Sequence, residues 1–422
     1  MGDIDSFLES QERGISTFRW VAAQTENLQS PIIQLFMGTR SSPTVIVTDF
    51  CEAEDISMRR CREFDRTDFL RYISQPLMPQ FHMMMKSDDP FVVAKPIYYS
   101  VQQAVELWGN KARLADGHPF EAFNDIYFGA FDAVLAFSYS SNFQHMTLPG
   151  RLQPISALER VELPVKAGSP VVFPESEQSK VTRAMLQLDE TVEETRKAVF
   201  PWLRCWYLTD NPDAQARLRE ALRQHLLDAV KEKRNPMHEE IIKATVPYLD
   251  ATIEEILRFA GTTPVTDREA MQDTTILGHQ IPKGTNVMMV TIGESILRPA
   301  FDIPDALRSK TALDASSRVR SWETSPFPVE DFKLERWLIK LDKDPDQMVY
   351  DATAGPQMAF GLGPRACFGR RLAYLELRMF TAMLIWNFDF LRCPPELSGY
   401  RGYDGLTVKP RRCYVKVSKI TL

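Results

Sequence analysis

The chain has 422 residues, 44% of them hydrophobic, which is enough for a large buried core without disulfide or metal cross-links. Its formal net charge of -6, from 50 basic and 56 acidic residues, argues against general nucleic-acid binding. Six cysteines are too few for a disulfide framework and form no CxxC pair, and the six histidines show no metal-binding spacing. These counts exclude a small disulfide-linked secreted fold and a structural zinc site.

The beginning of the chain carries no targeting signal. It has no basic segment followed by an apolar stretch, and no run of 18 apolar residues. We therefore expect a cytoplasmic protein without a transmembrane anchor, or one at the surface of the endoplasmic reticulum if this form lacks an anchor. No linker or charge block divides the sequence, so we expect a single domain over residues 1–422 and a monomer.

The first predicted elements are two short strands and a helix. Residues 32–37 and 44–48 are apolar runs separated by a Gly- and Pro-containing stretch, a pattern typical of a β-hairpin. Asp49 then precedes a predicted helix over residues 50–58. Residues 96–136 are mainly helical in pattern, with Val101, Ala104, Val105 and Trp108 forming an apolar stripe.

The middle of the chain alternates helical and extended patterns. We predict helix over residues 177–209, interrupted at Pro201, and a further helix from Pro212 to about Val230. Another helix begins at Asp250 or Thr252 and ends near Gly261. Residues 274–290 have strand character, with a turn predicted over residues 279–285, and residues 300–335 are irregular.

The last part of the chain predicts a long helix after Gly369, with an apolar face from Leu372 to Trp386, and a strand over residues 413–420. The sum is a mainly α protein with a minor β-sheet, an α+β class. The strands of this sheet come from segments far apart in the sequence.

The segment most informative about chemistry is FGLGPRACFG, residues 360–369. It is a glycine-rich turn that leads into the long helix, with Cys367 just before the helix starts. Free N–H groups and the positive end of the helix dipole favour an anion there, so we expect a lowered thiol pKa and a thiolate. Gly369 would let a flat group approach the backbone. The alternative is a buried structural cysteine in a helix-entry turn.

This segment resembles the haem-binding loop of cytochromes P450, FxxGxRxCxG, and matches it at every specified position. The resemblance implies that Cys367 is the axial thiolate of a haem iron. It also implies that Arg365 binds a haem propionate, that Phe360 packs near the thiolate and shields it, and that Gly369 belongs to the haem-binding loop.

Further motifs of the same family precede this loop in the expected order. Glu255 and Arg258 form an ExxR pair, and residues 332–337 (FKLERW) are similar to the family's FxPERF/W segment. The resemblance implies a buried triad of Glu255, Arg258 and Arg336 that fixes the fold behind the haem. Taken alone, the i,i+3 Glu/Arg pair would be a solvated pair on a helix face.

The resemblance covers nearly the whole chain and is most specific after residue 205. Within the family, the sequence resembles fungal microsomal members that act on secondary metabolites, but it lacks their usual N-terminal anchor. The N-terminal half departs from the family, so we expect a P450-like fold that is incomplete there. No WxxxR motif is present, since Arg113 lies five residues after Trp108.

The oxygen-activating helix also departs from the family. Glu194 and Thr195 could be a slipped form of the family's acid–threonine pair, but no glycine precedes them. Thr195 is therefore the catalytic candidate, and a charged, solvated helix face is the alternative interpretation.

The resemblance implies a haem-thiolate monooxygenase that oxidises an apolar small molecule, such as a secondary metabolite, with O2. Electrons would come from NADPH through an NADPH–cytochrome P450 reductase. Two alternatives remain open at this point. One is a haem-binding protein without monooxygenase activity, either a pseudoenzyme or an isomerase or dehydratase. The other is a non-catalytic helical interaction protein without cofactor.

Overall fold

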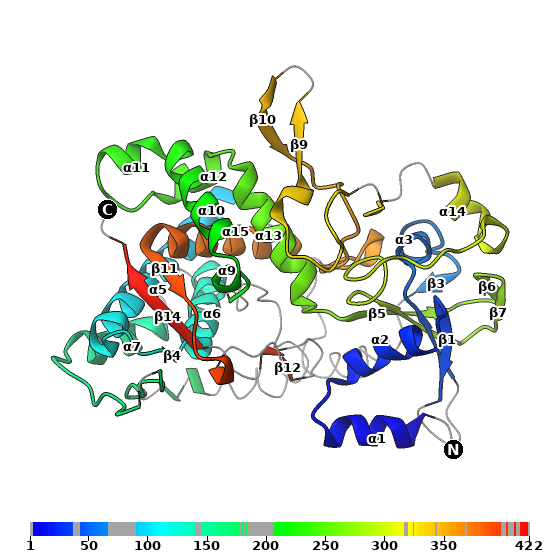
Figure 1. Cartoon of the computed structure of the whole chain (residues 1–422), viewed down its shortest axis with the longest axis horizontal. Helices are drawn as coiled ribbons and strands as arrows, with labels where there is room; N and C mark the ends of the chain where they lie inside the picture. Colours follow the sequence, from blue (N-terminus) through cyan, green and yellow to red (C-terminus); the bar gives the residue numbers. More distant parts are fainter. Residues whose placement is uncertain are drawn as a thin grey trace.

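A computed structural model provides the structure of the chain, shown in Figure 1. It describes residues 3–36, 43–65, 90–139, 146–166, 168–176, 179–180, 182–183, 206–315, 320–323, 325–341, 344–367, 369–397, 402–403, 409–410 and 414–420. The α-helices of these residues are α1 (Ile4–Glu12), α2 (Thr17–Asn27), α3 (Phe50–Met58), α5 (Pro90–Ala115), α6 (Phe123–Tyr139), α7 (Leu148–Ser156), α9 (Trp206–Asp210), α10 (Pro212–His225), α11 (Leu227–Lys231), α12 (His238–Lys243), α13 (Pro247–Ala260), α14 (Lys310–Ala315) and α15 (Arg370–Asn387).

The strands are short and form small sheets. They are β1 (Ile32–Leu35), β2 (Thr44–Val47), β3 (Phe64–Asp65), β4 (Phe120–Glu121), β5 (Val265–Ala270), β6 (Thr274–Ile276), β7 (His279–Ile281), β8 (Asn286–Val290), β9 (Leu338–Leu341), β10 (Asp344–Tyr350), β11 (Phe388–Leu391), β12 (Gly402–Tyr403), β13 (Lys409–Pro410) and β14 (Tyr414–Lys419). The largest sheet has the order β1-β2-β8-β5-β3, in which β2 and β8 pair in parallel and the other neighbours are antiparallel. A second sheet has the order β11-β14-β4.

Alternate side chains of a strand point to opposite faces of a sheet. At β2, the side chains on both faces of the five-stranded sheet are buried. Val45 and Val47 of β2 belong to an apolar cluster with α3, whereas Ile46 belongs to one with α2. In Figure 1 this sheet and helices α1 to α3 lie together on the right of the view. The sheet therefore joins segments separated by more than two hundred residues of sequence.

The helices on the left of Figure 1 form the main core. Helix α15 packs against α5, α10, α12 and α13, so its C-terminal half is buried on all sides. Trp108 of α5 and Trp386 of α15 are each 1% exposed within this core. The predicted stripe on α5 is buried, and the fold class is confirmed: mainly α with small β-sheets.

Several predicted boundaries are confirmed. β1 and β2 pair antiparallel, and α3 spans residues 50–58 with the Asp49 carboxylate accepting from the N–H of Glu52 at 2.8 Å. Helix α13 ends at Gly261, which adopts the left-handed conformation (φ 50°) of a helix C-cap. The strand β14 also agrees with the prediction.

Other predictions about these elements are wrong in detail. Helix α13 begins at Pro247, earlier than predicted, because proline suits the first position of a helix. The predicted turn over residues 279–285 contains the strand β7, which pairs with β6 across a tight turn at Leu277 and Gly278. The helix predicted from Pro212 to Val230 is divided at Leu226 into α10 and α11.

The predicted helix over residues 177–209 falls mostly outside the described residues, apart from α9 and short pieces before residue 184. Thr195 therefore lies outside the part of the chain that the structure describes. Within the described part, none of the helices has the length and apolar character needed to cross a membrane.

Candidate functional site

The loop at residues 360–367 is closed by its own backbone. The N–H of Cys367 donates to the carbonyl of Phe360 at 2.7 Å, and the N–H of Gly361 donates to that of Met358 at 2.8 Å. Gly361 and Gly363 have φ values of 66° and 69°, a conformation that L side chains rarely adopt. The cysteine therefore stands at the end of a tightly turned loop, three residues before Arg370, the first residue of α15.

Gly363 is also the point where α3 contacts this loop. A Cβ atom at Gly363 would lie 2.1 Å from the carbonyl oxygen of Ser57, so no larger residue fits without backbone movement. A Cβ at Gly369 would lie 3.9 Å from the sulfur of Cys367. Glycine at these two positions thus lets α3 approach the loop and leaves space beside the sulfur.

Cys367 differs from the other described cysteines. Of the four that the structure describes, Cys367 is exposed, whereas Cys51, Cys61 and Cys393 are partly buried. Cys367 therefore presents more surface to a ligand than the other described cysteines, although protein atoms cover part of its sulfur.

The prediction of a lowered thiol pKa is wrong for this structure. The backbone N–H groups of Gly369 and Arg370 do lower the pKa of Cys367, but surrounding protein atoms desolvate the sulfur and raise the pKa overall. A bound metal cation removes this penalty because it deprotonates a coordinating thiol. The sequence correctly predicted backbone N–H donors at the start of the helix, but it did not reveal the larger effect of desolvation on the thiol pKa.

The structure brings Glu255, Arg258 and Arg336 together. Arg258 donates to both carboxylate oxygens of Glu255 at 2.8 Å, and Nε of Arg336 donates to Oε1 at 3.2 Å. All three side chains are fully buried at these contacts. The remaining guanidinium N–H groups donate to backbone carbonyls, including Nη1 of Arg258 to Ile296 at 2.7 Å, and to the hydroxyl of Ser325 at 3.5 Å. The pair is therefore buried and satisfied, which excludes the solvated helix-face alternative.

Trp337 joins this cluster, although sequence reasoning did not single it out. Its indole N–H donates to Oε2 of Glu255 at 2.9 Å, and the residue has no exposed surface. The backbone N–H of Lys333 donates to Oε1 at 2.7 Å. The ERW segment thus supplies two direct partners of Glu255. The position of this tryptophan directly after Arg336 was the sequence feature that could have predicted its place in the cluster.

A second buried carboxylate lies next to the triad on α13. Glu254 accepts hydrogen bonds from Tyr350, Gln357 and Tyr374, and it is 3% exposed. The ring of Tyr374 lies against that of Phe360, with centroids 5.4 Å apart. Sequence reasoning missed this group. The only local signal was a second acid beside Glu255 in an otherwise apolar helix.

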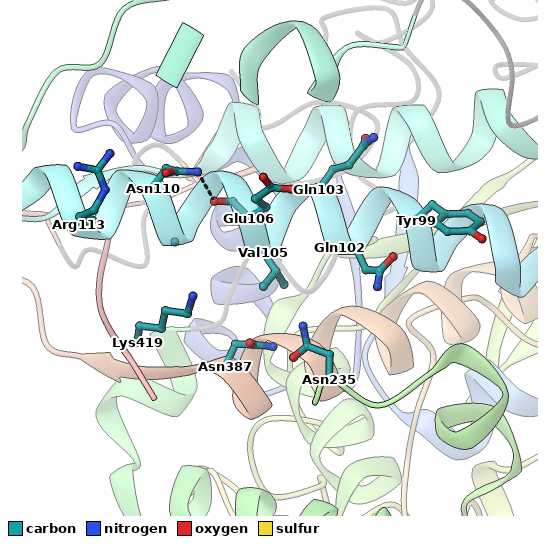
Figure 2. Close-up of a pocket in the computed structure, with 11 residues that line it drawn as sticks. Tyr99, Gln102, Gln103, Val105, Glu106, Asn110, Arg113, Asn235, Asn387 and Lys419 are labelled. Carbon is teal, nitrogen blue, oxygen red and sulfur yellow. Dashed lines mark hydrogen bonds between the residues drawn. The ribbon is translucent and has the colours of Figure 1, made fainter. Parts of the chain in front are cut away.

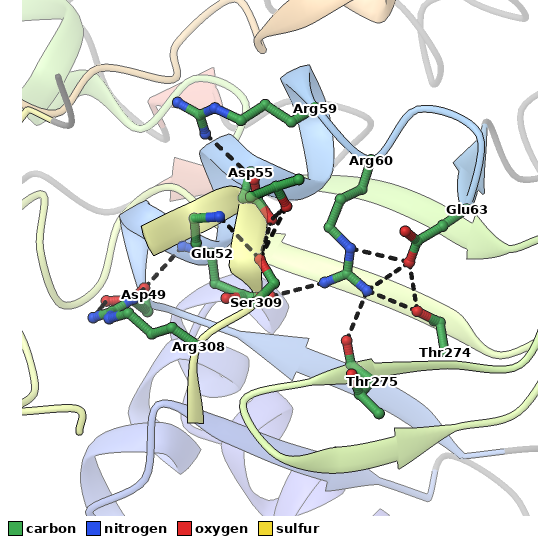
Figure 3. Close-up of polar contacts among 12 residues, drawn as sticks. Asp49, Glu52, Asp55, Arg59, Arg60, Glu63, Thr274, Thr275, Arg308 and Ser309 are labelled. Atoms are coloured by element: carbon green, nitrogen blue, oxygen red, sulfur yellow. Dashed lines mark hydrogen bonds and ion pairs between the residues drawn. The ribbon is translucent and has the colours of Figure 1, made fainter. Parts of the chain in front are cut away.

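Helix α3, which contacts the Cys367 loop, is held by the polar contacts in Figure 3. Arg60 donates to Glu52 at 3.0 Å, to Thr274 of β6 at 2.7 Å and to the carbonyl of Thr275 at 2.7 Å. At the other end of α3, Arg308 donates to Asp49 at 2.7 Å. Burial raises the pKa of Glu52 to about 7 despite the neighbouring Arg60. These bonds hold α3 to β6 and to the segment that carries Arg308.

A separate surface groove lies along α5, as Figure 2 shows. Its volume is about 1200 Å³, and polar residues of α5 such as Gln102 and Glu106 face Asn387 at the end of α15 and Lys419 of β14. Among the predicted site residues that the structure describes, none lines this groove. It is therefore a feature distinct from the Cys367 loop.

Comparison with known proteins gives the same assignment as the loop. The family model described as Cytochrome P450 matches residues 203–295 and 327–417. The chain is 31% identical to the cytochrome P450 monooxygenase TRI13 of Fusarium sporotrichioides, over 100% of this chain and 93% of that protein. The chain belongs to the cytochrome P450 family. As a member, it is a haem-dependent monooxygenase, an oxidoreductase.

Two further fungal P450s are similar. Cytochrome P450 monooxygenase xilC of Penicillium rubens is 27% identical over 98% of this chain and 89% of its own length. The Hps1-dma1 cluster P450 monooxygenase cyp3.1 of Dothistroma septosporum is 42% identical over 51% of this chain and 71% of its own length. The alignment with TRI13 spans 551 positions, so that P450 has residues at many positions where these 422 have none.

The residues present fit a haem bound from the Cys367 side. The sulfur of this exposed residue stands beside a glycine, and two backbone N–H groups donate to it. Within the described ranges, no three His, Cys, Asp or Glu side chains gather to hold a metal ion. The backbone of Arg365 lies in the 3-10 turn Gly363–Arg365, and its side chain is not among the described parts.

Proposed function

We propose that Cys367 is the axial thiolate ligand of the haem iron in this P450 monooxygenase. The observation that carries the proposal is an exposed cysteine residue at the end of a glycine-turned loop, in a chain whose family uses haem. When bound through a thiolate, haem supplies the iron that activates O2 and oxidises an organic substrate.

The protein's own residues would then hold and orient this ligand. The N–H groups of Gly369 and Arg370 would stabilise negative charge on the sulfur, and Gly369 would leave room for the flat macrocycle. Phe360 would shield the sulfur from water, and Arg365 would bind a propionate. The Glu255, Arg258 and Arg336 triad would keep the segment before the loop in place.

We propose an apolar small molecule, of the secondary-metabolite class, as the substrate. Support comes from the fungal relatives, one of which is named for a gene cluster. Electrons would come from NADPH through a cytochrome P450 reductase, as is usual in the family. Thr195 stays a prediction for the oxygen-activating residue, as does the single domain over residues 1–422.

The test is NADPH oxidation by haem-loaded protein mixed with a P450 reductase. We expect consumption of NADPH that needs O2 and that rises with an apolar probe such as ethoxycoumarin, which becomes fluorescent when dealkylated. The same protein with Cys367→Ala should consume NADPH no faster than the reductase alone. Equal rates for the two proteins would contradict the proposal. A haem-loaded wild type that binds the probe without turnover would instead favour the non-oxygenase alternative.

A further inference from the structure

Glu254 is the centre of a buried hydrogen-bond network that surrounds the Cys367 loop. Its Oε1 accepts from the hydroxyl of Tyr350 at 2.9 Å and from that of Tyr374 at 2.5 Å. Its Oε2 accepts from Nε2 of Gln357 at 3.1 Å. Tyr350 ends β10, Gln357 precedes the loop, and Tyr374 lies in the second turn of α15. One carboxylate on α13 thus holds segments on both sides of the loop.

The bonds to Glu254 are made in a poorly solvated place. Glu254 is 3% and Gln357 8% exposed, and burial raises the pKa of both Tyr350 and Tyr374. A hydrogen bond to a buried charged group contributes more than one at the surface, and its loss leaves the acceptor partly unsatisfied. The hydroxyl of Tyr374 is therefore firmly tied to α13.

Tyr374 connects this network to the loop. Its ring lies against that of Phe360 at 5.4 Å between centroids, and the guanidinium carbon of Arg370 lies 5.4 Å from the Tyr374 centroid. Phe360 in turn accepts the N–H of Cys367 through its carbonyl at 2.7 Å. A continuous series of contacts runs from Glu254 through Tyr374 and Phe360 to Cys367.

We infer that Glu254 and Tyr374 are positioning residues for the cysteine ligand. By fixing the Phe360 ring, they hold the Phe360 carbonyl and hence the backbone that aims the Cys367 sulfur. This inference rests on the proposed role of Cys367 as the haem ligand. Neither residue touches the reacting atoms. Their effect is on how well the thiolate stays on the iron.

Tyr350 provides a matched control. Like Tyr374, it donates a hydroxyl hydrogen bond to Oε1 of Glu254, but no ring contact joins it to Phe360 among the described residues. Tyr350→Phe and Tyr374→Phe both remove a hydroxyl bond to Oε1 of Glu254, and Tyr374→Phe also removes the contact of that hydroxyl with Arg370. Only the second frees the ring that supports Phe360.

The experiment compares haem-loaded wild type, Tyr374→Phe and Tyr350→Phe. The first readout is the rate at which the ferrous, CO-bound protein loses its red-shifted, thiolate-ligated Soret band. The second readout is the rate of haem transfer to apomyoglobin. Loss of one hydrogen bond to a charged group should raise both rates about fivefold in Tyr374→Phe. Tyr350→Phe should stay within about twofold of wild type.

The milder Glu254→Gln variant keeps an acceptor oxygen and guards against a misfolded Tyr374→Phe protein. It should raise both rates by less than Tyr374→Phe does and more than Tyr350→Phe does. Equal rates for the two tyrosine variants, or no change in either, would overturn the inference and leave Cys367 as the ligand. A wild type without any red-shifted band would overturn the proposed ligand itself, so the two failures are distinguishable.

Discussion

Glu376 should make the stability of this protein depend on pH in a defined direction. It lies on α15 with 2% of its surface exposed, and its Oε1 has no hydrogen-bond partner in the described structure. Burial alone raises the pKa of this carboxyl from 4.5 to about 8. The folded protein therefore holds a neutral, protonated Glu376 near neutral pH.

The size and sign of the effect follow from this shift. Between the unfolded pKa of 4.5 and the folded value of about 8, the folded state binds one more proton than the unfolded state. The free energy of unfolding then falls by about 1.4 kcal/mol for each pH unit in that window. The contribution of Glu376 is fully present below pH 4.5 and is lost by about pH 8, roughly 5 kcal/mol in all as an upper bound.

Glu376→Gln keeps the shape and removes the ionisation. Urea unfolding of wild type and variant, measured from about pH 5 to about pH 8, should show the variant gaining stability relative to wild type as the pH rises. Glu159→Gln, at an exposed position, is the matched control and should run parallel to wild type. If the free energy of unfolding of Glu376→Gln also changes with pH in parallel with that of the wild type, the buried carboxyl does not titrate as described.

Two further substitutions test the site's packing. Gly363→Ala places a Cβ 2.1 Å from the carbonyl of Ser57 and should cost at least about 2 kcal/mol more than Gly284→Ala, which has a similar positive φ but open space around it. Thermal unfolding and haem content measure this, and equal losses would argue against a tight contact between α3 and the loop. Arg258→Lys removes the paired bonds to the buried carboxylate and should cost about 3 kcal/mol in urea unfolding, whereas Arg217→Lys in an exposed pair should cost less than about 1 kcal/mol. Similar losses at both arginines would contradict the burial argument.

The elements best predicted from sequence are those with local end signals. Asp49 accepts a backbone N–H at the start of α3, and Gly261 adopts the left-handed conformation at the end of α13, so both roles are visible in the sequence. The β6–β7 turn was misplaced because two turn signals lie close together. Gly278 closes the hairpin, and Gly284 closes a later turn, both at positive φ. Patterns alone did not decide between them.

The haem-binding loop could be predicted from the sequence because all of its motif residues lie in one contiguous segment, from Phe360 to Gly369. The hydrogen-bond network of Glu254 could not be predicted, since Tyr374 and Glu254 are 120 residues apart in the sequence and come together only in the folded protein. The predicted direction of the Cys367 pKa shift was wrong for the same reason. Helix-terminal N–H groups can be inferred locally, but desolvation depends on distant segments.

The most direct test of the account is the spectrum of the reduced protein with carbon monoxide after loading with haem. Thiolate ligation by Cys367 predicts a strongly red-shifted Soret band in the wild type and its loss in Cys367→Ala. Cys393→Ala, at a partly buried cysteine, should keep the band. A red-shifted band that survives Cys367→Ala, or a wild type that takes up haem without it, would contradict the central claim.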